Sequence, residues 1–486
     1  MSLELFEHFL SDESRRGPAA DGAFTGAAGG AACGDLARLS LVLERGRVAS
    51  VSFDSEGCGA TRAATAAVAE MVDGETVVAA ARIGPDEVDE AIGGLTPAKR
   101  HAVQLAADAL HRALAKAAAS SAQLAPQGVN RVLVAMSGGV DSAVAALLER
   151  ERGADVLGVT VKLWADPQTD GAKACCSPEA VLGARAVAHS IDVPHFTLDL
   201  EEDFRRRVVA EFISGYAAGA TPNPCIACNG EVRIAAMVDL AKRLGADRLV
   251  TGHYARIVDD GAGPLLAAAS DAAKDQSYML AALPPEMLPR LGFPLADLSK
   301  PEVRQIAARH GLAVARRPES QDLCFLAGQG KRGFLRRHGG LRDRDGDILD
   351  RSGGVIGRHR GHHHFTVGQR RGIGVSAPEA LYVTATDAAA NTVTVGTRAD
   401  LAARRVTIHD VVMHRDGATV DAVRLRYRSR PVPAVVSAEP GSYSELELEL
   451  GETFDAASPG QAAVLLSGEA IVGHGTIASG PGPMPK

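Results

Sequence analysis

The stretch at residues 131–142, R-V-L-V-A-M-S-G-G-V-D-S, constrains the fold of this chain more than any other. A run of aliphatic residues breaks into two adjacent glycines, and helix-forming residues follow from Ala143. This order predicts a strand, a tight loop and a helix start. Adjacent glycines let the backbone turn without steric conflict, and a helix start presents N–H groups and a positive dipole. The stretch therefore predicts a phosphate-binding loop.

The spacing of these glycines differs from that of a Walker loop, which needs a Lys and a Ser or Thr after the second glycine, and from a dinucleotide fingerprint. Residues 137–142 resemble instead the pyrophosphate loop of the N-type ATP pyrophosphatases. That resemblance implies an enzyme that adenylates a substrate oxygen and releases pyrophosphate. The alternative, an ordinary glycine turn between a strand and a helix, is disfavoured by six consecutive matching residues.

Strand and helix patterns alternate after the loop. Strands are expected at 156–161, 195–198 and 248–254, and helices at 178–189, 202–217 and 231–244. This alternation is typical of an α/β fold, a doubly wound parallel sheet whose ligands bind at the carboxyl ends of its strands. Helices are expected to stop near residue 326. Short strands at 380–385, 392–395, 405–411, 420–426, 446–450 and 462–466 then predict a small β-rich domain followed by a β-barrel.

The region before the loop predicts a separate α+β domain. Strands are expected at 39–43 and 48–53 and helices at 60–71, 86–92 and 99–116, followed by a low-charge segment typical of a linker. The chain is therefore expected to divide into an N-terminal domain at 1–117, a linker at 118–130, a pyrophosphate-loop domain at 131–325, a central β-rich domain at 326–395 and a C-terminal β-barrel at 396–486.

Cysteine content and hydropathy indicate where such a chain works. The 486 residues include 7 cysteines, an odd number, and no apolar run of membrane-spanning length. The first ten residues carry two Glu and no Lys or Arg, unlike a signal peptide. We therefore expect a cytoplasmic protein without a membrane partner, whose cysteines are reduced thiols, metal ligands or redox groups.

The charge is unevenly distributed along the chain. The formal net charge is -7, but residues 1–120 hold 17 acidic and 11 basic residues, whereas residues 331–371 hold 11 Lys or Arg against 4 Asp. A basic stretch of this kind is often only a solvated surface, and it is also what contact with a nucleic-acid phosphate backbone requires. The central β-rich domain is therefore a candidate RNA-contacting surface.

Two cysteines of the N-terminal domain stand beside glycines, Cys33 in A-C-G-D and Cys58 in G-C-G, where a bare backbone allows a metal to approach. Together with E-H-F at 7–9 and K-R-H at 99–101, these motifs resemble the iron-sulfur cluster scaffold family of the NifU/IscU type. Ala102 stands where that family has its third cysteine. The resemblance leaves a candidate metal-ligand set of Cys33, Asp35, Cys58 and His101. The domain then holds a labile cluster or serves as a docking module without metal.

Three later motifs add to the ATP-binding core: two carry cysteines that suit sulfur chemistry, and one is densely polar. T-P-N-P-C-I-A-C-N places Cys225 and Cys228 in a proline-stiffened loop before a helix, where the helix dipole favours a thiolate. S-Q-D-L-C-F adds Cys324. K-D-Q-S-Y at 274–278 is too polar for a core and is a candidate contact for a nucleotide or RNA.

Residues 129–480 resemble the tRNA-uridine 2-sulfurtransferases, the 2-thiouridylases that act on the wobble uridine. The resemblance rests on the motifs above together with G-H-Y at 252–254, T-V-G-Q-R at 366–370 and R-Y-R at 426–428. It implies ATP binding by Ala135, Met136, Ser137, Gly138, Gly139, Val140, Asp141, Ser142, Val161 and Gly252. It implies contact with the target base by Asn223, Pro224 and Cys225, and contact with tRNA by Lys274, Asp275, Gln276, Arg426 and Tyr427. It makes Cys228 the nucleophile and Cys324 the persulfide-bearing cysteine.

By that resemblance, ATP adenylates the C2 oxygen of uridine, which turns an inert carbonyl oxygen into a leaving group, and sulfur attacks C2 with loss of AMP. Mg²⁺ would offset the triphosphate charge. The base must be splayed from its loop to reach a buried pocket. The expected partners are tRNA and a sulfur donor, such as a cysteine desulfurase or a sulfur-relay protein.

Cys225 stands where many relatives carry Asp, and it leaves two forms of sulfur delivery open. In the first, Cys228 releases sulfur from a persulfide on Cys324. In the second, Cys225, Cys228 and Cys324 are ligands of a [4Fe-4S] cluster whose remaining iron is open to a hydrosulfide. The third thiol and the scaffold-like domain on the same chain favour the cluster, which is our hypothesis.

Two other functions remain as alternatives. A pyrophosphate-loop synthetase acting on a small metabolite would need neither Cys228 nor Cys324. An iron-sulfur assembly or carrier protein would transfer clusters and leave tRNA unmodified, and the missing third scaffold cysteine weighs against it. The adjacent Cys175 and Cys176 diverge on any regular element and are interpreted as structural or incidental.

Overall fold

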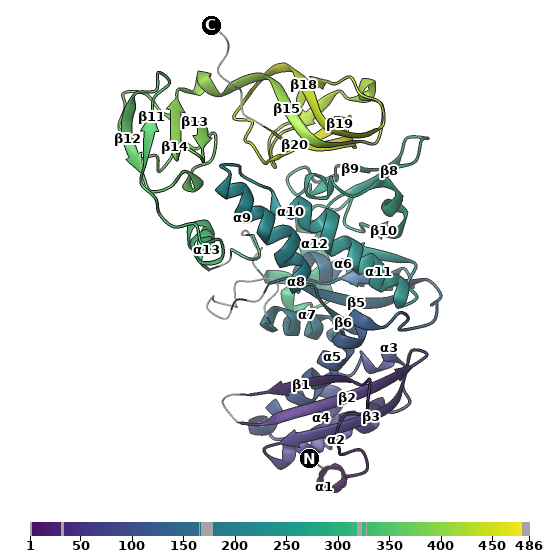
Figure 1. The fold of residues 1–486 in the computed structure, drawn as a ribbon. Helices are drawn as coiled ribbons and strands as arrows, with labels where there is room; N and C mark the ends of the chain where they lie inside the picture. The colour runs from purple at the N-terminus through teal and green to yellow at the C-terminus, as the bar shows by residue number, and fades with distance from the viewer. Residues whose placement is uncertain are drawn as a thin grey trace.

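The described part of the chain folds around four β-sheets, from an N-terminal domain at one end of the molecule to a β-barrel at the other (Figure 1). The structure is a computed structural model that describes residues 2–30, 34–164, 166, 178–317, 323–326 and 328–478. Several residues discussed above lie outside the described residues: Cys33, Cys175, Cys176, and the Ser320, Gln321 and Asp322 that precede Cys324. Within these ranges, no helix combines the length and the apolar character needed to cross a membrane.

The N-terminal domain packs helices against a three-stranded antiparallel sheet. Its strands, in the order β1-β2-β3, are β1 (Phe24–Gly29), β2 (Leu36–Glu44) and β3 (Arg47–Glu56). Its helices are α1 (Leu3–Ser11), α2 (Gly59–Val72), α3 (Val77–Ala80), α4 (Pro85–Ala91) and α5 (His101–Ser120). The buried side chains of α2 and α5 are mostly alanine, which allows close packing. A Cβ at Gly26 would overlap the Ala109 carbonyl of α5, so the contact with β1 requires glycine.

The next domain is built on a five-stranded parallel sheet in the order β10-β7-β4-β5-β6. Its strands are β4 (Arg131–Ala135), β5 (Asp155–Lys162), β6 (His195–Asp199), β7 (Arg248–Thr251) and β10 (Leu291–Gly292). Its helices are α6 (Val140–Glu151), α7 (Pro178–Ser190), α8 (Glu201–Phe204), α9 (Ala210–Ala217), α10 (Pro224–Ala227), α11 (Ile234–Arg243) and α12 (Lys300–Arg309). Val132 and Val134 of β4 share a hydrophobic cluster with α6, whereas Leu133 belongs to the cluster that contains α11. Helices therefore cover both faces of the sheet.

The helix that carries the first two cysteines begins earlier than expected. Instead of starting at residue 231, it begins with α10 and continues through a π-helical segment (Cys228–Arg233) into α11. The Cys225 N–H donates to the Asn223 side chain at 3.1 Å, and Pro224 occupies the first helical position. The expected loop around these cysteines is therefore wrong, because Asn-Pro acts here as an N-cap followed by a helix start.

The expectation that helices stop near residue 326 is also wrong, because α13 (Gly330–His338) follows. It buries Phe334 and Leu335 in a cluster with residues of the parallel-sheet domain. A small sheet domain comes next, with strands in the order β12-β11-β14-β13. Its strands are β11 (Gly346–Leu349), β12 (Val355–His359), β13 (Tyr382–Asp387) and β14 (Thr392–Gly396).

The C-terminal domain is a closed β-barrel. Its strands are β15 (Ala402–Met413), β16 (Ala422–Arg424), β17 (Val432–Val435), β18 (Gly441–Asp455), β19 (Ala462–Ser467) and β20 (Ala470–Ile477). Pairing of β15 with β20 closes the ring. A hairpin from the parallel-sheet domain, β8 (Arg256–Asp259) and β9 (Pro264–Ala267), joins the same sheet through β20. These sheets confirm the predicted fold class.

The N-terminal domain lies against β6, the edge strand of the parallel sheet. The backbone N–H of His195 donates to the carbonyl of Ala81 at 3.0 Å, and Nε2 of His189 donates to the same carbonyl at 3.2 Å. Within the N-terminal domain, Nε2 of His111 on α5 donates to the Ile83 carbonyl at 2.9 Å. The N-terminal domain thus covers an edge strand that would otherwise present unpaired backbone groups.

The segment expected to be a linker is held in place. Leu124 is fully buried, and the backbone N–H groups of Leu124 and Ala125 donate to the Arg243 carbonyl at the end of α11, at 2.8 and 3.1 Å. The Arg243 guanidinium donates to the carbonyls of Ala118 and Ser121. The two domains are therefore docked against each other on both sides of the connection.

Candidate active site and metal centre

The predicted phosphate loop is present between β4 and α6. The Ser137 N–H donates to the Ser142 hydroxyl oxygen at 3.1 Å, and that hydroxyl donates to the Gly139 carbonyl at 3.1 Å. Gly138 has φ +71°, in the left-handed region that favours glycine. These bonds fix the loop around the N-terminus of α6, where a phosphate is expected. Met136, directly before the loop, and Val140, within it, are buried.

The remaining candidate ATP-binding positions lie at the same edge of the sheet. Ala135 and Val161 stand at or near the carboxyl ends of the paired strands β4 and β5. Gly252 follows β7, and a Cβ there would lie 2.8 Å from backbone atoms of Asp141 and Ser142. This close approach requires a residue without a side chain. The structure therefore brings these candidates together around the start of α6.

Asp141, the acidic residue of the loop, is paired with two residues that the sequence analysis did not assign to the site. The Lys300 ammonium donates to both carboxylate oxygens at 2.7 Å, and the Tyr254 hydroxyl donates to one of them at 2.9 Å. Lys300 is the first residue of α12, and its side chain is 9% exposed. The signal that could have found it is a Lys at a capped helix start, where a basic residue opposes the helix dipole.

His253 links the end of β7 to the cysteine-bearing helix. Arg233, in the π-helical segment, donates to Nε2 of His253 at 3.0 Å, so the ring proton is on Nδ1, which donates to the Thr251 hydroxyl oxygen at 2.8 Å. Burial, reinforced by the neighbouring Arg233 charge, lowers the pKa of His253 to about 3. The imidazole is therefore neutral at physiological pH and acts as a fixed link.

Cys225 and Cys228 lie one turn apart on the same helix. Cys228 is buried and Cys225 is half-buried. Asn229, next to Cys228, donates through its side-chain amide to the Met279 carbonyl at 2.9 Å, and the Asn223 amide contacts the Met279 sulfur at 3.8 Å. The helix start is therefore fixed to the segment that follows the K-D-Q-S-Y motif.

Cys324 is half-buried at the edge of an aromatic cluster. Phe325, directly after it, packs edge-on against Phe212 and Trp164, with ring centroids 5.0 and 6.4 Å away. Trp164 follows β5 and also contacts Phe334 of α13. The segment that carries Cys324 is therefore anchored by the one tryptophan in the sequence.

The three cysteines of the candidate sulfur site come from two segments of the parallel-sheet domain. Among the described residues, Cys225, Cys228 and Cys324 do not form a group whose candidate ligand atoms all lie within 4.8 Å of one another. Each cysteine ligand of a [4Fe-4S] cluster binds a different iron, so such ligands stand farther apart than the ligands of a single metal ion, and this spacing is compatible with both forms of sulfur delivery.

The K-D-Q-S-Y motif combines buried and partly exposed residues. Asp275 is 8% exposed, and its carboxylate accepts hydrogen bonds from within the motif and forms a 2.8 Å ion pair with Arg424 of the barrel. The Gln276 N–H donates to the Tyr254 carbonyl at 2.8 Å, and the Gln276 side-chain oxygen accepts from the Tyr254 N–H at 3.1 Å. Asp275 therefore joins the parallel-sheet domain to the barrel, while Lys274 and Gln276 are partly exposed.

Arg426 and Tyr427 approach this motif from the barrel. The exposed Arg426 donates to the Ala456 carbonyl at 3.1 Å. The ring of Tyr427 lies 5.9 Å, centroid to centroid, from Tyr278 at the end of the motif. The structure therefore brings the candidate tRNA-contacting residues of the barrel to the parallel-sheet domain.

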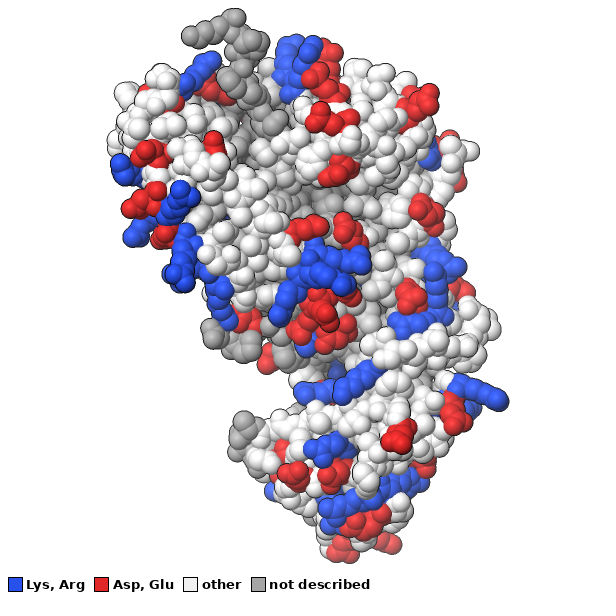
Figure 2. Space-filling model, in the orientation of Figure 1, with Lys and Arg blue, Asp and Glu red and all other residues white. Residues whose placement is uncertain are grey.

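The basic stretch of the sequence forms part of the surface. Figure 2 shows Lys and Arg side chains along the outer edge of the small sheet domain, with acidic side chains between them. The exposed basic residues of this stretch are Arg332, Arg336, Arg337, Arg342, Arg344, Arg351, Arg358, Arg360, Arg370 and Arg371.

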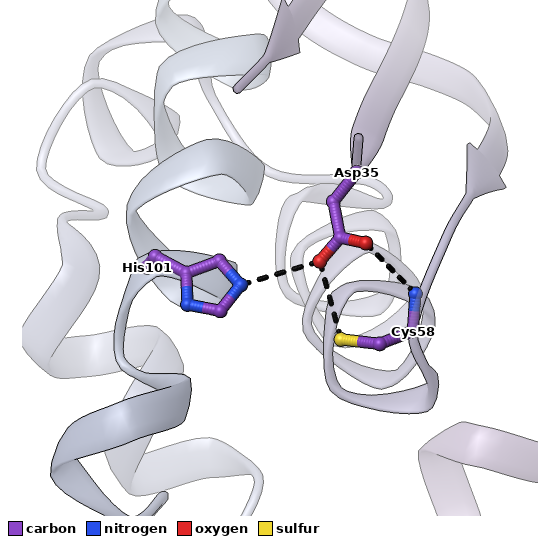
Figure 3. Close-up of side chains that lie close together, drawn as sticks. All are labelled: Asp35, Cys58 and His101. Carbon is purple, nitrogen blue, oxygen red and sulfur yellow. Dashed lines mark hydrogen bonds and ion pairs between the residues drawn. The ribbon is translucent and has the colours of Figure 1, made fainter. Parts of the chain in front are cut away.

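Asp35, Cys58 and His101 converge from three elements of the N-terminal domain (Figure 3). Asp35 precedes β2, Cys58 precedes α2 and His101 begins α5. The Asp35 carboxylate accepts from the Cys58 N–H at 2.9 Å and lies 3.2 Å from Nε2 of His101. The candidate ligand atoms all lie within 4.8 Å of one another, and a thiolate, an imidazole and a carboxylate suit zinc or iron. This is a candidate metal centre, and its expected fourth member, Cys33, lies outside the described residues.

The Asp35 carboxylate is held ionised. Burial alone would raise its pKa, but hydrogen bonds from Thr61, at 2.7 Å, and from Cys58 outweigh burial and lower the pKa of Asp35 to about 2. Gly57 has φ +110°, and a Cβ there would overlap a carboxylate oxygen of Asp35. The glycine of the G-C-G motif therefore leaves space for the Asp35 carboxylate, whose negative charge favours binding of a cation.

Four family models match consecutive parts of the chain. They are described as a NifU-like N terminal domain at 4–123, a tRNA methyl transferase HUP domain at 130–328, a tRNA methyl transferase PRC-barrel domain at 332–397 and an aminomethyltransferase beta-barrel domain at 403–477. The phosphate loop lies in the HUP match, and the Asp35 centre lies in the NifU-like match. The fold and the two sites define an ATP-binding enzyme of the HUP class joined to an iron-sulfur scaffold-like domain.

The chain is similar to one relative over almost its whole length and to another over the part that follows the N-terminal domain. The chain is 44% identical over 467 residues to the bifunctional protein NifU/MnmA of Rubrobacter xylanophilus, and the match covers 93% of both chains. It is 41% identical over 356 residues to the tRNA-specific 2-thiouridylase MnmA of Geobacter metallireducens, a match that covers 71% of this chain and 96% of that relative. The chain belongs to the tRNA-specific 2-thiouridylase family, in its bifunctional NifU/MnmA form. The family and the enzyme class predicted from the motifs are confirmed.

Proposed function

We propose that the chain thiolates the wobble uridine of tRNA at C2 through an adenylated uridine. One observation carries the proposal: Gly252 packs on the start of α6, and the next residue, His253, is bonded to Arg233 of the cysteine-bearing helix. Consecutive residues therefore join the phosphate loop to the helix of Cys228. This connection suits a reaction in which ATP and sulfur act on the same base.

The proposed reaction has two steps. The C2 oxygen of uridine attacks the α-phosphorus of ATP and pyrophosphate leaves; sulfur then bonds to C2 as the C2–O bond breaks and AMP leaves. The N–H groups at the start of α6 would bind the phosphates, and Mg²⁺ would offset their charge. Asn223, Pro224 and Cys225 are proposed to approach the base.

The tRNA is proposed to bind across the barrel and the small sheet domain. Lys274, Gln276, Arg426 and Tyr427 border one region, and the exposed arginines between residues 332 and 371 supply charge for the phosphate backbone. Asp275 supports this surface from within, through its ion pair with Arg424.

Sulfur is proposed to reach the base through Cys228 and Cys324. In the persulfide form, a sulfur donor such as a cysteine desulfurase loads Cys324. The Cys228 thiolate then attacks the Cys324 sulfur, hydrosulfide leaves, and a disulfide forms that a thiol reductant must reopen. In the cluster form, Cys225 joins the other two as a ligand of a [4Fe-4S] cluster, which supplies a binding site for hydrosulfide.

The decisive test is the amount of 2-thiouridine in tRNA after incubation with the full chain, ATP, Mg²⁺ and a sulfur donor. Cys228→Ser and Cys324→Ser should each abolish thiolation, whereas Cys175→Ser, the matched control, should preserve it. Thiolation that survives both changes would overturn the proposal. Cluster transfer to an apo-protein without any thiouridine would identify a carrier instead.

The two forms of sulfur delivery separate on iron content. Anaerobically purified protein that contains cluster iron, and that loses both iron and thiolation in Cys225→Ser, would support the cluster form. Full thiolation by iron-free protein would support the persulfide form.

We also propose that Asp35, Cys58 and His101, with Cys33, bind a metal ion or a labile cluster. The proximity of the Asp35, Cys58 and His101 ligand atoms and the ionised state of Asp35 support this role. Elemental analysis of the full chain should find metal that is lost in Asp35→Asn and retained in Asp21→Asn, a change at an exposed residue of the same domain. Equal metal content in the two variants would refute the assignment.

A further inference from the structure

The ion pair between Lys300 and Asp141 connects α12 to the phosphate loop. Nζ of Lys300 lies 2.7 Å from both carboxylate oxygens. The Lys300 side chain is 9% exposed and that of Asp141 is 33% exposed. Asp141 is the second residue of α6, so the pair stands beside the expected phosphate position.

The buried Lys300 side chain is not expected to contribute much to the stability of the fold. Burying an ammonium group costs desolvation free energy that pairing with a carboxylate only partly offsets. Lys300 also begins α12, where its charge opposes the helix dipole. Because neither effect favours a lysine at this position, its contact with the loop carboxylate points to a role in the site.

The charge of Asp141 explains that role. A carboxylate in the first turn of α6 repels a triphosphate that binds at the same helix start. We propose that Lys300 is a positioning residue of the ATP site, which acts by neutralising Asp141 so that the loop accepts a triphosphate. This inference rests on the proposed use of ATP by the loop.

The surroundings hold Lys300 in place. Its backbone N–H donates to the Asp271 carboxylate at 3.1 Å, and Ser299 and Glu302 form a capping box at the start of α12. The Lys300 ammonium also lies 6.0 Å from the centroid of the Tyr254 ring, whose hydroxyl donates to Asp141. Lys300 and Tyr254 therefore hold the carboxylate together.

The test compares nucleotides that differ in phosphate charge. Calorimetry would measure binding of ATP and AMP, each with Mg²⁺, to the full chain and to Lys300→Met, Lys300→Arg and Arg309→Met. We expect Lys300→Met to weaken ATP binding about tenfold and AMP binding less than about threefold, because repulsion grows with the number of phosphate charges. Lys300→Arg retains the charge, and Arg309→Met removes a charge from the far end of α12, so both should keep the wild-type ratio of affinities.

A double variant completes the test. Adding Asp141→Asn to Lys300→Met removes the uncompensated carboxylate and should restore most of the ATP affinity. Equal losses for ATP and AMP in Lys300→Met, or no recovery in the double variant, would overturn the proposal. A wild-type chain that binds neither nucleotide would overturn the proposed use of ATP instead. Thermal unfolding of each variant corrects the binding data for any loss of folded protein.

Discussion

Nε2 of His195 lies 2.8 Å from the hydroxyl oxygen of Thr160, and that hydroxyl donates to the Met136 carbonyl at 2.7 Å. Because the hydroxyl has one hydrogen to give, the His195 ring must be the donor to Thr160 and carries its proton on Nε2. The His195 backbone N–H donates to Ala81 of the N-terminal domain. A chain of hydrogen bonds therefore runs from that domain, across β6 and β5, to the start of the phosphate loop.

Thr160→Val should lower the free energy of unfolding by about 1–3 kcal/mol, because the Met136 carbonyl and the His195 ring N–H would lose their buried partner. The KM for ATP should also rise, since Met136 begins the phosphate loop. Urea unfolding and steady-state thiolation measure the two effects. Thr197→Val is the control: the Thr197 hydroxyl is buried on β6 and has no hydrogen-bond partner in the described structure, so its loss should be neutral. Equal effects of the two changes would contradict the proposed chain of bonds.

Stability should fall as the pH drops below about 6.5, the usual histidine pKa, because histidines are buried at the domain boundary. Burial holds the pKa of His111 and of His195 well below the usual range and lowers the pKa of His189, and the Arg185 charge acts in the same direction. The unfolded chain therefore binds protons that the folded rings do not, which favours unfolding at acid pH.

The pH effect can be measured by urea unfolding at about pH 8 and about pH 5.5, on either side of that transition. His189→Gln should reduce the difference between the two pH values, whereas His8→Gln, at an exposed residue, should leave it unchanged. A difference that persists in full without the His189 ring would show that other groups cause it.

Gly57→Ala should destroy the candidate metal centre. Gly57 has φ +110°, and the added methyl group would overlap the Asp35 carboxylate. Gly22→Ala is the matched control, because Gly22 has φ +76° but open space around it. Both changes should cost backbone strain, on the order of 1 kcal/mol in the open position, and only Gly57→Ala should lose bound metal. Metal that survives in Gly57→Ala would show that Asp35 is not a ligand.

Asp275→Ala should loosen the barrel, because the Arg424 guanidinium, 20% exposed, would lose its carboxylate partner. We expect a loss of about 3 kcal/mol in thermal or urea unfolding. Arg426→Gln, two residues further along the exposed edge, should instead preserve stability and weaken tRNA binding in a salt-dependent manner. A fully stable Asp275→Ala protein with weak tRNA binding would favour a direct tRNA contact by Asp275.

The parallel-sheet domain could be predicted from the sequence because its signals are local. The strand, the two glycines and the helix of the phosphate loop are consecutive, so their order dictates the turn. By contrast, α13 contains Gly330 and Gly333 and a run of charged residues. Its stability depends on burying Phe334 beside Trp164, a contact between segments far apart in the chain.

The candidate active site was likewise predictable only where its residues are close together in the sequence. The candidate residues of the phosphate loop are consecutive in the sequence and lie together at the start of α6, whereas Lys300 and Asp141 are separated by 159 positions and meet only in the folded chain. Asp275 shows the converse: its polar neighbours in the sequence suggested an exposed contact, but it is buried and the barrel supplies its partner, Arg424. Pairings between domains carry no local signal in the sequence.

The N-terminal domain is docked on the parallel-sheet domain, through Ala81 on β6 and through Leu124 on α11. This docking bears on why the two domains are joined in one chain. Hydrogen bonds and the buried Leu124 hold the domain of the Asp35 centre against the parallel-sheet domain, so this centre is not carried on a flexible tether. The benefit of fusion then lies in stoichiometry: every thiolation site is synthesised together with one scaffold-like site, at the same time and at the same place.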